Sequence, residues 1–275
     1  LPTPKAVLFD AYGTLFDVHS LIDMAEQLFP GRGHKLVLLW RDKQIEYSRL
    51  LTMSNRYASF WDLTCNALRY SVLRFELPVD HESEAKLLAQ YRMLKPFPEN
   101  RAVLTQLKKR GIKAGILSNG DPPMLEAAVQ SAGFRDLLNP ILSVDTVRRF
   151  KTDAAAYALG PKALGLPAKD ILFVSSNCWD ALGATWHGYT TLWINRDGVP
   201  LDQLGVEPTR MGASLREVLS FFIPDPERPW PNASSPAACR WPLRFIASSS
   251  NKCCPAAAWS RPRSGAASMR WPTIW

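Results

Sequence analysis

An aspartate that directly follows a short apolar run is the first residue of the chain with chemical potential. Residues 6–9 (Ala-Val-Leu-Phe) have the length and the β-branched and aromatic content of a strand buried on both faces. Asp10 then lies at the carboxyl end of that strand, where ligands meet catalytic groups in open α/β sheets. Its carboxylate can act as a nucleophile and form a covalent ester. The competing interpretation is an aspartate that only caps a turn, because short motifs often match by chance.

Polar side chains follow the other predicted strands in the same way. Gly13 supplies a tight turn after Asp10, and Thr14 can hydrogen-bond the carboxylate or the turn backbone. Ser118 and Asn119 end the apolar run 113–119 and can donate hydrogen bonds to a substrate carboxylate or to an ester oxygen. The alternative is that both only form a turn or cap a helix.

A third polar group follows the run 170–175, and its members are Ser175, Asn177 and Asp180. Asp180 fits a role as an orienting group or as the general base for the water that hydrolyses an ester. The alternative is that it caps a helix beginning at residue 181, and the two roles are compatible. Together the three groups predict a reaction site at the carboxyl ends of neighbouring strands.

Elements that position these groups alternate between strand and helix. Beyond the first strand, the apolar runs 113–119, 141–144, 170–175 and 190–194 are predicted strands. Helical patterns cover residues 99–110, 122–132, 153–164, 181–187 and 211–223, with Gly111 and Gly133 predicted to end the first two. This alternation predicts an α/β fold with a doubly wound, Rossmann-like parallel sheet.

Residues 17–96 interrupt the alternation with helical patterns alone, at 34–53, 56–75 and 82–94. The sequence Lys-Pro-Phe-Pro at 95–98 ends the helices and returns the chain to the sheet. We therefore predict a catalytic core of residues 1–16 and 97–223, with an all-helical cap inserted at 17–96. We call residues 17–96 the helical insert.

Residues 224–275 have a different composition, with nine Pro and five Trp and no helical or strand period. Such segments are typical of disordered or extended chain. Translation out of an ancestral frame and a partner-binding tail are both compatible with this composition. The tail holds seven basic and two acidic residues, so it carries +5 of the formal net charge of +8 and leaves +3 on the body. A modestly positive body suits anionic substrates and gives no indication of nucleic-acid binding.

Cysteine and hydropathy patterns predict a cytoplasmic protein. Cys65 and Cys178 lie in the body and the other three cysteines in the tail, without a disulfide framework or a zinc spacing. No basic segment leads into an apolar signal run, and no run of about 18 apolar residues predicts a membrane span.

Four motifs in combination resemble the L-2-haloacid dehalogenase branch of the haloacid dehalogenase superfamily. They are Asp-Ala-Tyr-Gly-Thr at 10–14, Leu-Ser-Asn-Gly at 117–120, Phe-Lys at 150–151 and Val-Ser-Ser-Asn-Cys-Trp-Asp at 174–180. The similarity extends over about residues 5–222. The resemblance implies hydrolytic dehalogenation of short L-2-haloalkanoates to 2-hydroxy acids with inversion. It also implies the cap domain, a homodimer and no cofactor.

Residue roles come from the same resemblance. Asp10 is the nucleophile, Lys151 holds it ionised, and Arg41 receives the halide with help from Asn177. The remaining members of the implied site are an apolar wall and a second aromatic position, namely Tyr12, Phe60, Trp179 and Tyr157. Without the resemblance, Lys151 and Arg41 would be interpreted as surface charges and Tyr157 equally well as a core aromatic.

Two departures separate the chain from the phosphatases of the superfamily. Those enzymes carry an acid two residues after the nucleophile, where this chain has Tyr12, and an acidic pair for magnesium, where it has Ser176 and Asn177. Magnesium prefers several oxygen ligands that include carboxylates, so no metal site is expected. A third departure is Asp42, where the dehalogenases commonly carry Gln, and its carboxylate is positioned in sequence to pair with Arg41 and weaken halide binding. A metal-dependent phosphatase and a binding protein that uses the basic tail are the alternative functions.

Overall fold

Six parallel strands form one sheet in the computed structural model, which describes residues 3–222. In chain order they are β1 (Ala6–Phe9), β2 (Lys113–Ser118), β3 (Ile141–Ser143), β4 (Ile171–Ser175), β5 (Thr190–Ile194) and β6 (Arg210–Gly212). Their order across the sheet is β3-β2-β1-β4-β5-β6. The predicted tail lies outside the described residues.

Strand β1 lies in the middle of the sheet, and the strand order reverses beside it. Phe9 is paired with Ile116 of β2 on one side and with Val174 of β4 on the other. The carboxyl ends of three strands therefore meet at one level, immediately before Asp10. A crevice at such a switch point is the usual ligand site of a doubly wound sheet, and the predicted fold class is confirmed.

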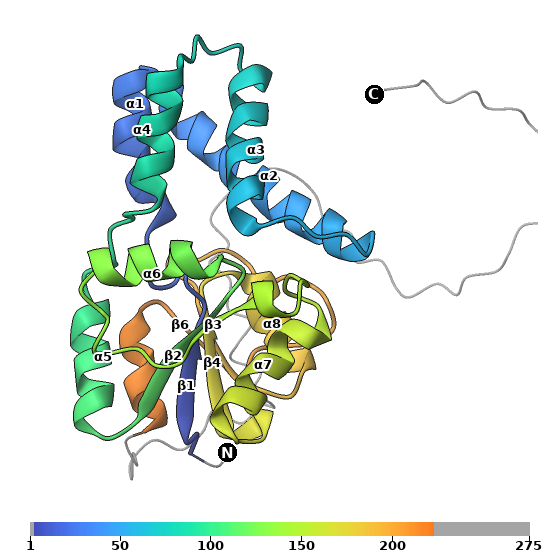
Figure 1. Cartoon of the computed structure of the whole chain (residues 1–275). Helices are drawn as coiled ribbons and strands as arrows, with labels where there is room; N and C mark the ends of the chain where they lie inside the picture. The colour runs from blue at the N-terminus through green and yellow to red at the C-terminus, as the bar shows by residue number, and fades with distance from the viewer. Residues whose placement is uncertain (1–2, 223–275) are drawn as a thin grey trace, which may run out of the picture. The chain divides into compact units, whose positions relative to one another are not determined.

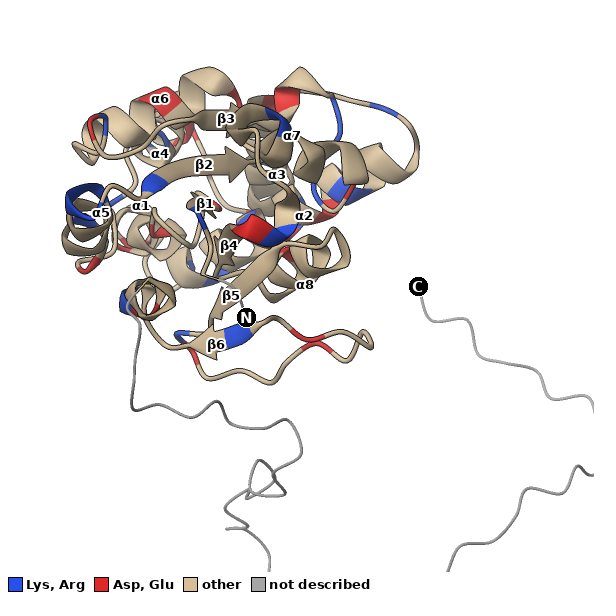
Figure 2. Cartoon of the chain, turned by 90° about the horizontal axis from the view of Figure 1, so that it is seen from below, with Lys and Arg blue, Asp and Glu red and all other residues tan. Residues whose placement is uncertain are grey.

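Helices cover both faces of this sheet (Figures 1 and 2). One face carries α5 (Asn100–Lys109) together with the 3₁₀ helix η4 (Leu215–Phe221), and the other carries α7 (Ala154–Leu164) and α8 (Cys178–Trp186). Helix α6 (Pro122–Ser131) packs against β3. Strands β1, β2, β4 and β5 are almost completely buried between these layers. Burial on both faces explains their continuous apolar sequences.

Two predicted helix ends are confirmed in detail. Gly111 and Gly133 follow α5 and α6 with φ of 70° and 66°, a conformation that costs glycine little. The next amides, of Ile112 and Phe134, donate to the carbonyls of Leu107 and Val129. This is the Schellman pattern, which satisfies the last carbonyls of each helix.

Three predicted boundaries were wrong. Residues 211–223 were expected to be helical, but 210–212 form the edge strand β6 and only 215–221 form a 3₁₀ helix. The helix predicted from residue 181 begins at Cys178, and Asn177 is its N-cap, so Asp180 is not the cap. The pattern predicted from residue 56 becomes helical at Phe60, because Ser59 accepts the Asp62 amide and starts the helix there.

The helical insert contains η1 (Val18–Leu21), α1 (Ile22–Leu28), α2 (Gly33–Met53), α3 (Phe60–Arg74) and α4 (His81–Tyr91). Its helices pack on one another, most extensively α2 on α3 and α1 on α2. The indole of the buried Trp40 donates to the Thr64 carbonyl at 2.8 Å and fixes α2 against α3.

The proposed division of the chain into a core and a cap stays a prediction. No helix within residues 3–222 is both long and apolar enough to cross a membrane.

A residue of the sheet side supplies the hydrogen bonds that α3 needs at its start. The carboxylate of Asp121 accepts from the backbone amides of Phe60 and Trp61, both at 2.8 Å. The first amides of a helix have no partner inside it, and a negative charge there is favoured. Asp121 therefore fixes Phe60 and its helix to the segment that follows β2.

Replacing this carboxylate should destabilise the protein. Asp121→Ala leaves two amides without their acceptor, and we expect a loss of about 1–3 kcal/mol in the free energy of unfolding, measured in urea. Asp62→Ala is the matched control, because Asp62 is an exposed acidic residue in the same first turn. Equal losses in the two variants would contradict this role for Asp121.

Candidate active site

Two buried carboxylates share one ammonium group at the carboxyl end of β1. The Nζ atom of Lys151 donates to Asp10 Oδ1 at 3.1 Å and to Asp180 Oδ2 at 3.0 Å. The Lys151 and Asp180 side chains are at most 1% exposed, and that of Asp10 is 9% exposed. Buried charges are stable only when they are paired and hydrogen-bonded, and here each carboxylate has both. The sequence prediction that Lys151 lies beside Asp10 is confirmed, and Asp180 joins them.

The second oxygen of Asp10 also has donors. Asn177 Nδ2 lies 3.0 Å from Asp10 Oδ2, and the Thr14 hydroxyl lies 3.4 Å from the same oxygen. Thr14 Oγ1 in turn accepts the Ser176 amide at 2.8 Å, which ties the turn after β1 to the turn after β4. With both oxygens engaged, the carboxylate of Asp10 has a fixed orientation.

Asp180 is completely buried, and burial raises its pKa above the ordinary value for a carboxyl group. Lys151 opposes that rise, and so does the Tyr157 hydroxyl, which donates to Asp180 Oδ1 at 2.7 Å. Burial also raises the pKa of Tyr157 well above its usual value, so this phenol keeps its proton and remains a donor. Tyr157 is thus a buried aromatic residue whose hydroxyl hydrogen-bonds a carboxylate of the site, that of Asp180.

Three of the predicted polar residues hold the surrounding turns. Asn119 Oδ1 accepts the Lys151 amide at 2.9 Å, so the segment after β2 positions the segment that carries the lysine. The Ser118 and Ser175 hydroxyls each accept a backbone amide two residues on, those of Gly120 and Asn177, at 3.1 Å. The turn-forming interpretation therefore fits the Ser118 hydroxyl, whereas the Asn119 side chain bonds a segment distant in sequence.

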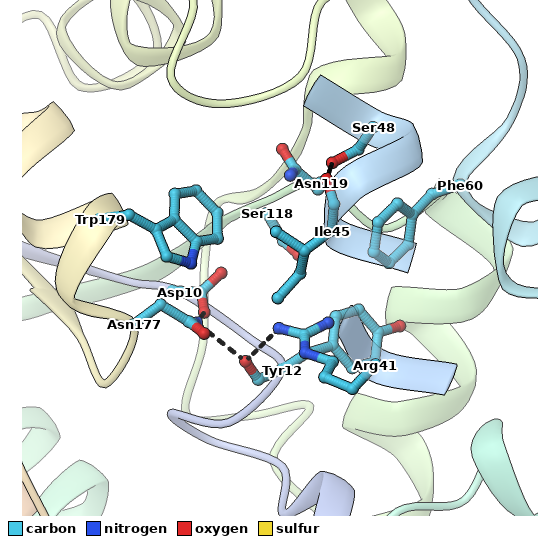
Figure 3. A pocket seen from close by; sticks show the side chains of 10 residues that line it. All are labelled: Asp10, Tyr12, Arg41, Ile45, Ser48, Phe60, Ser118, Asn119, Asn177 and Trp179. Carbon is cyan, nitrogen blue, oxygen red and sulfur yellow. Dashed lines mark hydrogen bonds between the residues drawn. The ribbon is translucent and has the colours of Figure 1, made fainter. Parts of the chain in front are cut away.

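A pocket opens above Asp10 between the turns of the sheet and helices α2 and α3 (Figure 3). Eight of its ten lining residues belong to the predicted site, namely Asp10, Tyr12, Arg41, Phe60, Ser118, Asn119, Asn177 and Trp179. The other two, Ile45 and Ser48, come from α2 and were not predicted as site residues. Thr14, Lys151, Tyr157, Ser175 and Asp180 lie behind this lining and support it.

Helical spacing explains the two missed residues. Ile45 lies four residues after Arg41, and Ser48 lies three residues after Ile45, so all three lie on one face of α2. Once Arg41 is assigned to the pocket, this spacing selects Ile45 as its apolar neighbour. Arg196 was also not predicted as a site residue. Its guanidinium donates to the carbonyls of Gly13 and Thr14 at 3.2 and 3.3 Å and so holds the turn after Asp10.

Positive charge enters the pocket from α2. The guanidinium of Arg41 donates to Gln44 Oε1 at 2.7 Å and to the Tyr12 carbonyl at 3.3 Å. Asp42 is exposed, and among residues 3–222 no carboxylate forms an ion pair with Arg41. The expected interference from Asp42 is therefore absent from this structure. The guanidinium of Arg49, the residue after Ser48, lies 4.8 Å from the centre of the Trp179 ring and links α2 to α8.

Comparison with known proteins agrees with this geometry. The model of the haloacid dehalogenase-like hydrolases matches residues 4–188. The chain belongs to this hydrolase family. It is 45% identical over 218 residues to an (S)-2-haloacid dehalogenase of Pseudomonas sp. (strain YL), a match that covers 79% of this chain and 94% of that protein.

Two solved structures extend the likeness of this hydrolase to three dimensions. The L-2-haloacid dehalogenase RSc1362 is 54% identical with a TM-score of 0.78, over 80% of this chain and 99% of that one. The L-2-haloacid dehalogenase from Xanthobacter autotrophicus, solved with chloropropionic acid covalently bound, is 35% identical with a TM-score of 0.74. That match covers 80% of this chain and 98% of the other.

The donor set of the hydrolase does not fit the magnesium of the superfamily's phosphatases. The two carboxylates of the site, Asp10 and Asp180, both pair with Lys151, and an amide and a hydroxyl replace the phosphatases' acidic pair. Within the described part of the chain, no three His, Cys, Asp or Glu side chains converge as metal ligands would. Burial raises the pKa of Tyr12 well above its usual value, so this phenol is a poor substitute for the phosphatases' acid.

The contact between Tyr157 and Asp180 predicts a shift in the pH dependence of the enzyme. Tyr157→Phe removes a donor to the ionised carboxylate, so the pKa of Asp180 should rise further. If turnover needs ionised Asp180, activity falls as pH drops through this pKa, and the acid limb should move to higher pH by about one unit.

The measurement is the pH profile of kcat for wild type and variant. Tyr189→Phe is the control, because the Tyr189 hydroxyl donates to the Tyr157 carbonyl and not to Asp180. An acid limb that stays in place in Tyr157→Phe would show that this hydrogen bond does not govern the titration.

Proposed function

We propose that this hydrolase converts short L-2-haloalkanoates to 2-hydroxy acids through an ester formed on Asp10. The observation that carries the proposal is the carboxylate of Asp10, held by Lys151 and Asn177 at the base of a pocket that Arg41 enters from the opposite side. A nucleophile and a cation that face each other across a small pocket suit displacement of an anionic leaving group.

In the first step, Asp10 attacks the C2 carbon of the substrate and the carbon–halogen bond breaks in line. The halide leaves with the bonding electron pair and needs no proton, in contrast to the leaving alkoxide of a phosphate ester. Arg41 supplies a permanent positive charge for it, and the rings of Phe60 and Trp179 limit access of water. Ser118 and Asn119 line the same pocket and are the proposed partners of the substrate carboxylate.

In the second step, water attacks the carbonyl carbon of the Asp10 ester. Asp180 is the proposed base that takes the water proton, and its raised pKa makes it a stronger base than an exposed carboxylate. The donors that now hold the two Asp10 oxygens, from Lys151, Asn177 and Thr14, would stabilise the oxyanion that forms there. Collapse of this intermediate breaks the bond between the Asp10 carbonyl carbon and the substrate oxygen. Asp180 returns its proton to the departing alkoxide, the second water proton is released to solvent, and the 2-hydroxy acid leaves with the Asp10 carboxylate regenerated.

Stereochemistry follows from these two steps. The displacement inverts C2, and the hydrolysis breaks the bond to the Asp10 carbonyl carbon and leaves C2 untouched. The net result is inversion, so an L substrate gives a D product.

The homodimer implied by the family resemblance stays a prediction, as does the location of the protein in the cytoplasm.

The first test is halide release from L-2-chloropropionate in the presence of EDTA. We expect wild-type turnover to be unaffected by the chelator, because no step uses a metal. Asp10→Asn should lower the rate by at least about 10³-fold, since it removes the nucleophile. Asp17→Asn is the matched control at a nearby aspartate that caps η1. Turnover of a phosphate ester that requires magnesium, with no halide release, would support the phosphatase alternative instead.

The ester itself predicts an isotope pattern. In a single turnover in H₂¹⁸O, with enzyme in excess, water oxygen should enter the Asp10 carboxylate, because water attacks the protein carbonyl and not C2. The peptide that contains Asp10 should gain about 2 Da by mass spectrometry, and the hydroxy acid should stay unlabelled. Label in the product and none in the peptide would exclude the ester and indicate direct attack of water on C2.

A further inference from the structure

Gln44 is a completely buried amide beside the proposed halide site, and the mechanism above assigns it no role. Its Oε1 atom accepts from Arg41 at 2.7 Å and from the Tyr91 hydroxyl at 3.1 Å. Its Nε2 atom donates to Thr64 Oγ1 at 2.6 Å. Both polar atoms of the Gln44 amide therefore have hydrogen-bond partners, and one of these partners is Arg41. Gln44 itself does not line the pocket.

The neighbours of Gln44 determine which way its amide faces. The Thr64 hydroxyl donates its only proton to the Phe60 carbonyl at 2.7 Å, so it can only accept from Gln44. The nitrogen of the amide must then face Thr64, and the oxygen must face Arg41. A hydrogen-bonded chain thus runs from the backbone of Phe60, a wall residue of the pocket, to the guanidinium of Arg41.

This series of hydrogen bonds fixes the guanidinium of Arg41 without neutralising its charge. The guanidinium of Arg41 has five N–H donors. By the shortest contacts, one of these donates to Gln44 and another to the Tyr12 carbonyl. Both acceptors are neutral, and the nearest acidic residue in the sequence, Asp42, is exposed. A carboxylate in the place of Gln44 would hold the guanidinium equally well but would cancel the charge that an anion needs.

We infer that Gln44 is a positioning residue for the halide site, which it serves by orienting Arg41 while leaving its charge free for the anion. The inference rests on the proposed function, since Arg41 is the halide partner only there. According to this inference, the affinity of the pocket for the departing halide depends on Gln44, a buried neutral side chain. Binding of the substrate carboxylate should not depend on Gln44.

The test measures anion binding without turnover. Chloride binding is followed by the ³⁵Cl line width in NaCl, and binding of propionate, which has the carboxylate and lacks the halogen, by saturation-transfer NMR. Gln44→Leu removes the acceptor and Gln44→Glu keeps it but adds a charge. In both variants we expect the chloride Kd to rise about tenfold or more, with the propionate Kd changed by less than about threefold.

Ser71→Ala is the matched control, because Ser71 is a buried polar residue of α3 whose hydroxyl donates to the Ala67 carbonyl of its own helix. It should keep the wild-type affinity for both anions. Gln44→Glu guards against misfolding, because Thr64 can turn its hydroxyl to donate to the new carboxylate. Unchanged chloride binding in both Gln44 variants, or equal loss of chloride and propionate, would overturn the inference.

The result separates this inference from the proposed function. A wild type that binds chloride in a Gln44-dependent way but releases no halide from 2-haloacids would retain the inference and refute the function. An active wild type whose chloride affinity does not depend on Gln44 would refute the inference alone. A wild type that binds no chloride would refute the halide site and Gln44's role together.

Discussion

One ammonium group between two buried carboxylates is the interaction on which the rest of the structure depends. Breaking a buried ion pair by removing one partner costs about 3–5 kcal/mol, so Asp10, Lys151 and Asp180 must reach the interior together. Three separate segments carry them: the turn after β1, the stretch before α7 and the first turn of α8. The reversal of strand order beside β1 is what brings these segments to one edge of the sheet.

Local rules were sufficient for the framework, whereas the resemblance to a known family supplied most of the candidate site. Continuous apolar runs identify buried parallel strands, and glycines such as Gly111 identify helix ends, because both features satisfy local steric and hydrogen-bonding requirements. Asp10, the proposed nucleophile, and Lys151 were assigned to the candidate site because four motifs occur in combination. No single motif would have distinguished Lys151, a side chain of the deep interior, from an ordinary surface lysine.

Features that depend on tertiary contact could not be read in this way. Strand β6 has only three residues and an exposed methionine, so its pairing with β5, not its sequence, defines it. Ser118 and Ser175 carry the residue types of ligand-binding groups, yet their hydroxyls serve nearby amides. Gln44 contacts Arg41 from three residues on in α2, but it also bonds Thr64 of α3 and Tyr91 of α4, and no spacing in the sequence connects these three helices.

The contact between Asp121 and the start of α3 bears on how this family can diversify. A helical segment that shapes a substrate pocket is an attractive unit to exchange between relatives by recombination. Here that unit is completed by a side chain encoded outside it, since the first amides of α3 depend on a carboxylate that follows β2. A transplanted insert therefore carries its pocket wall into a new host in the correct orientation only if the host provides an acceptor at the position of Asp121.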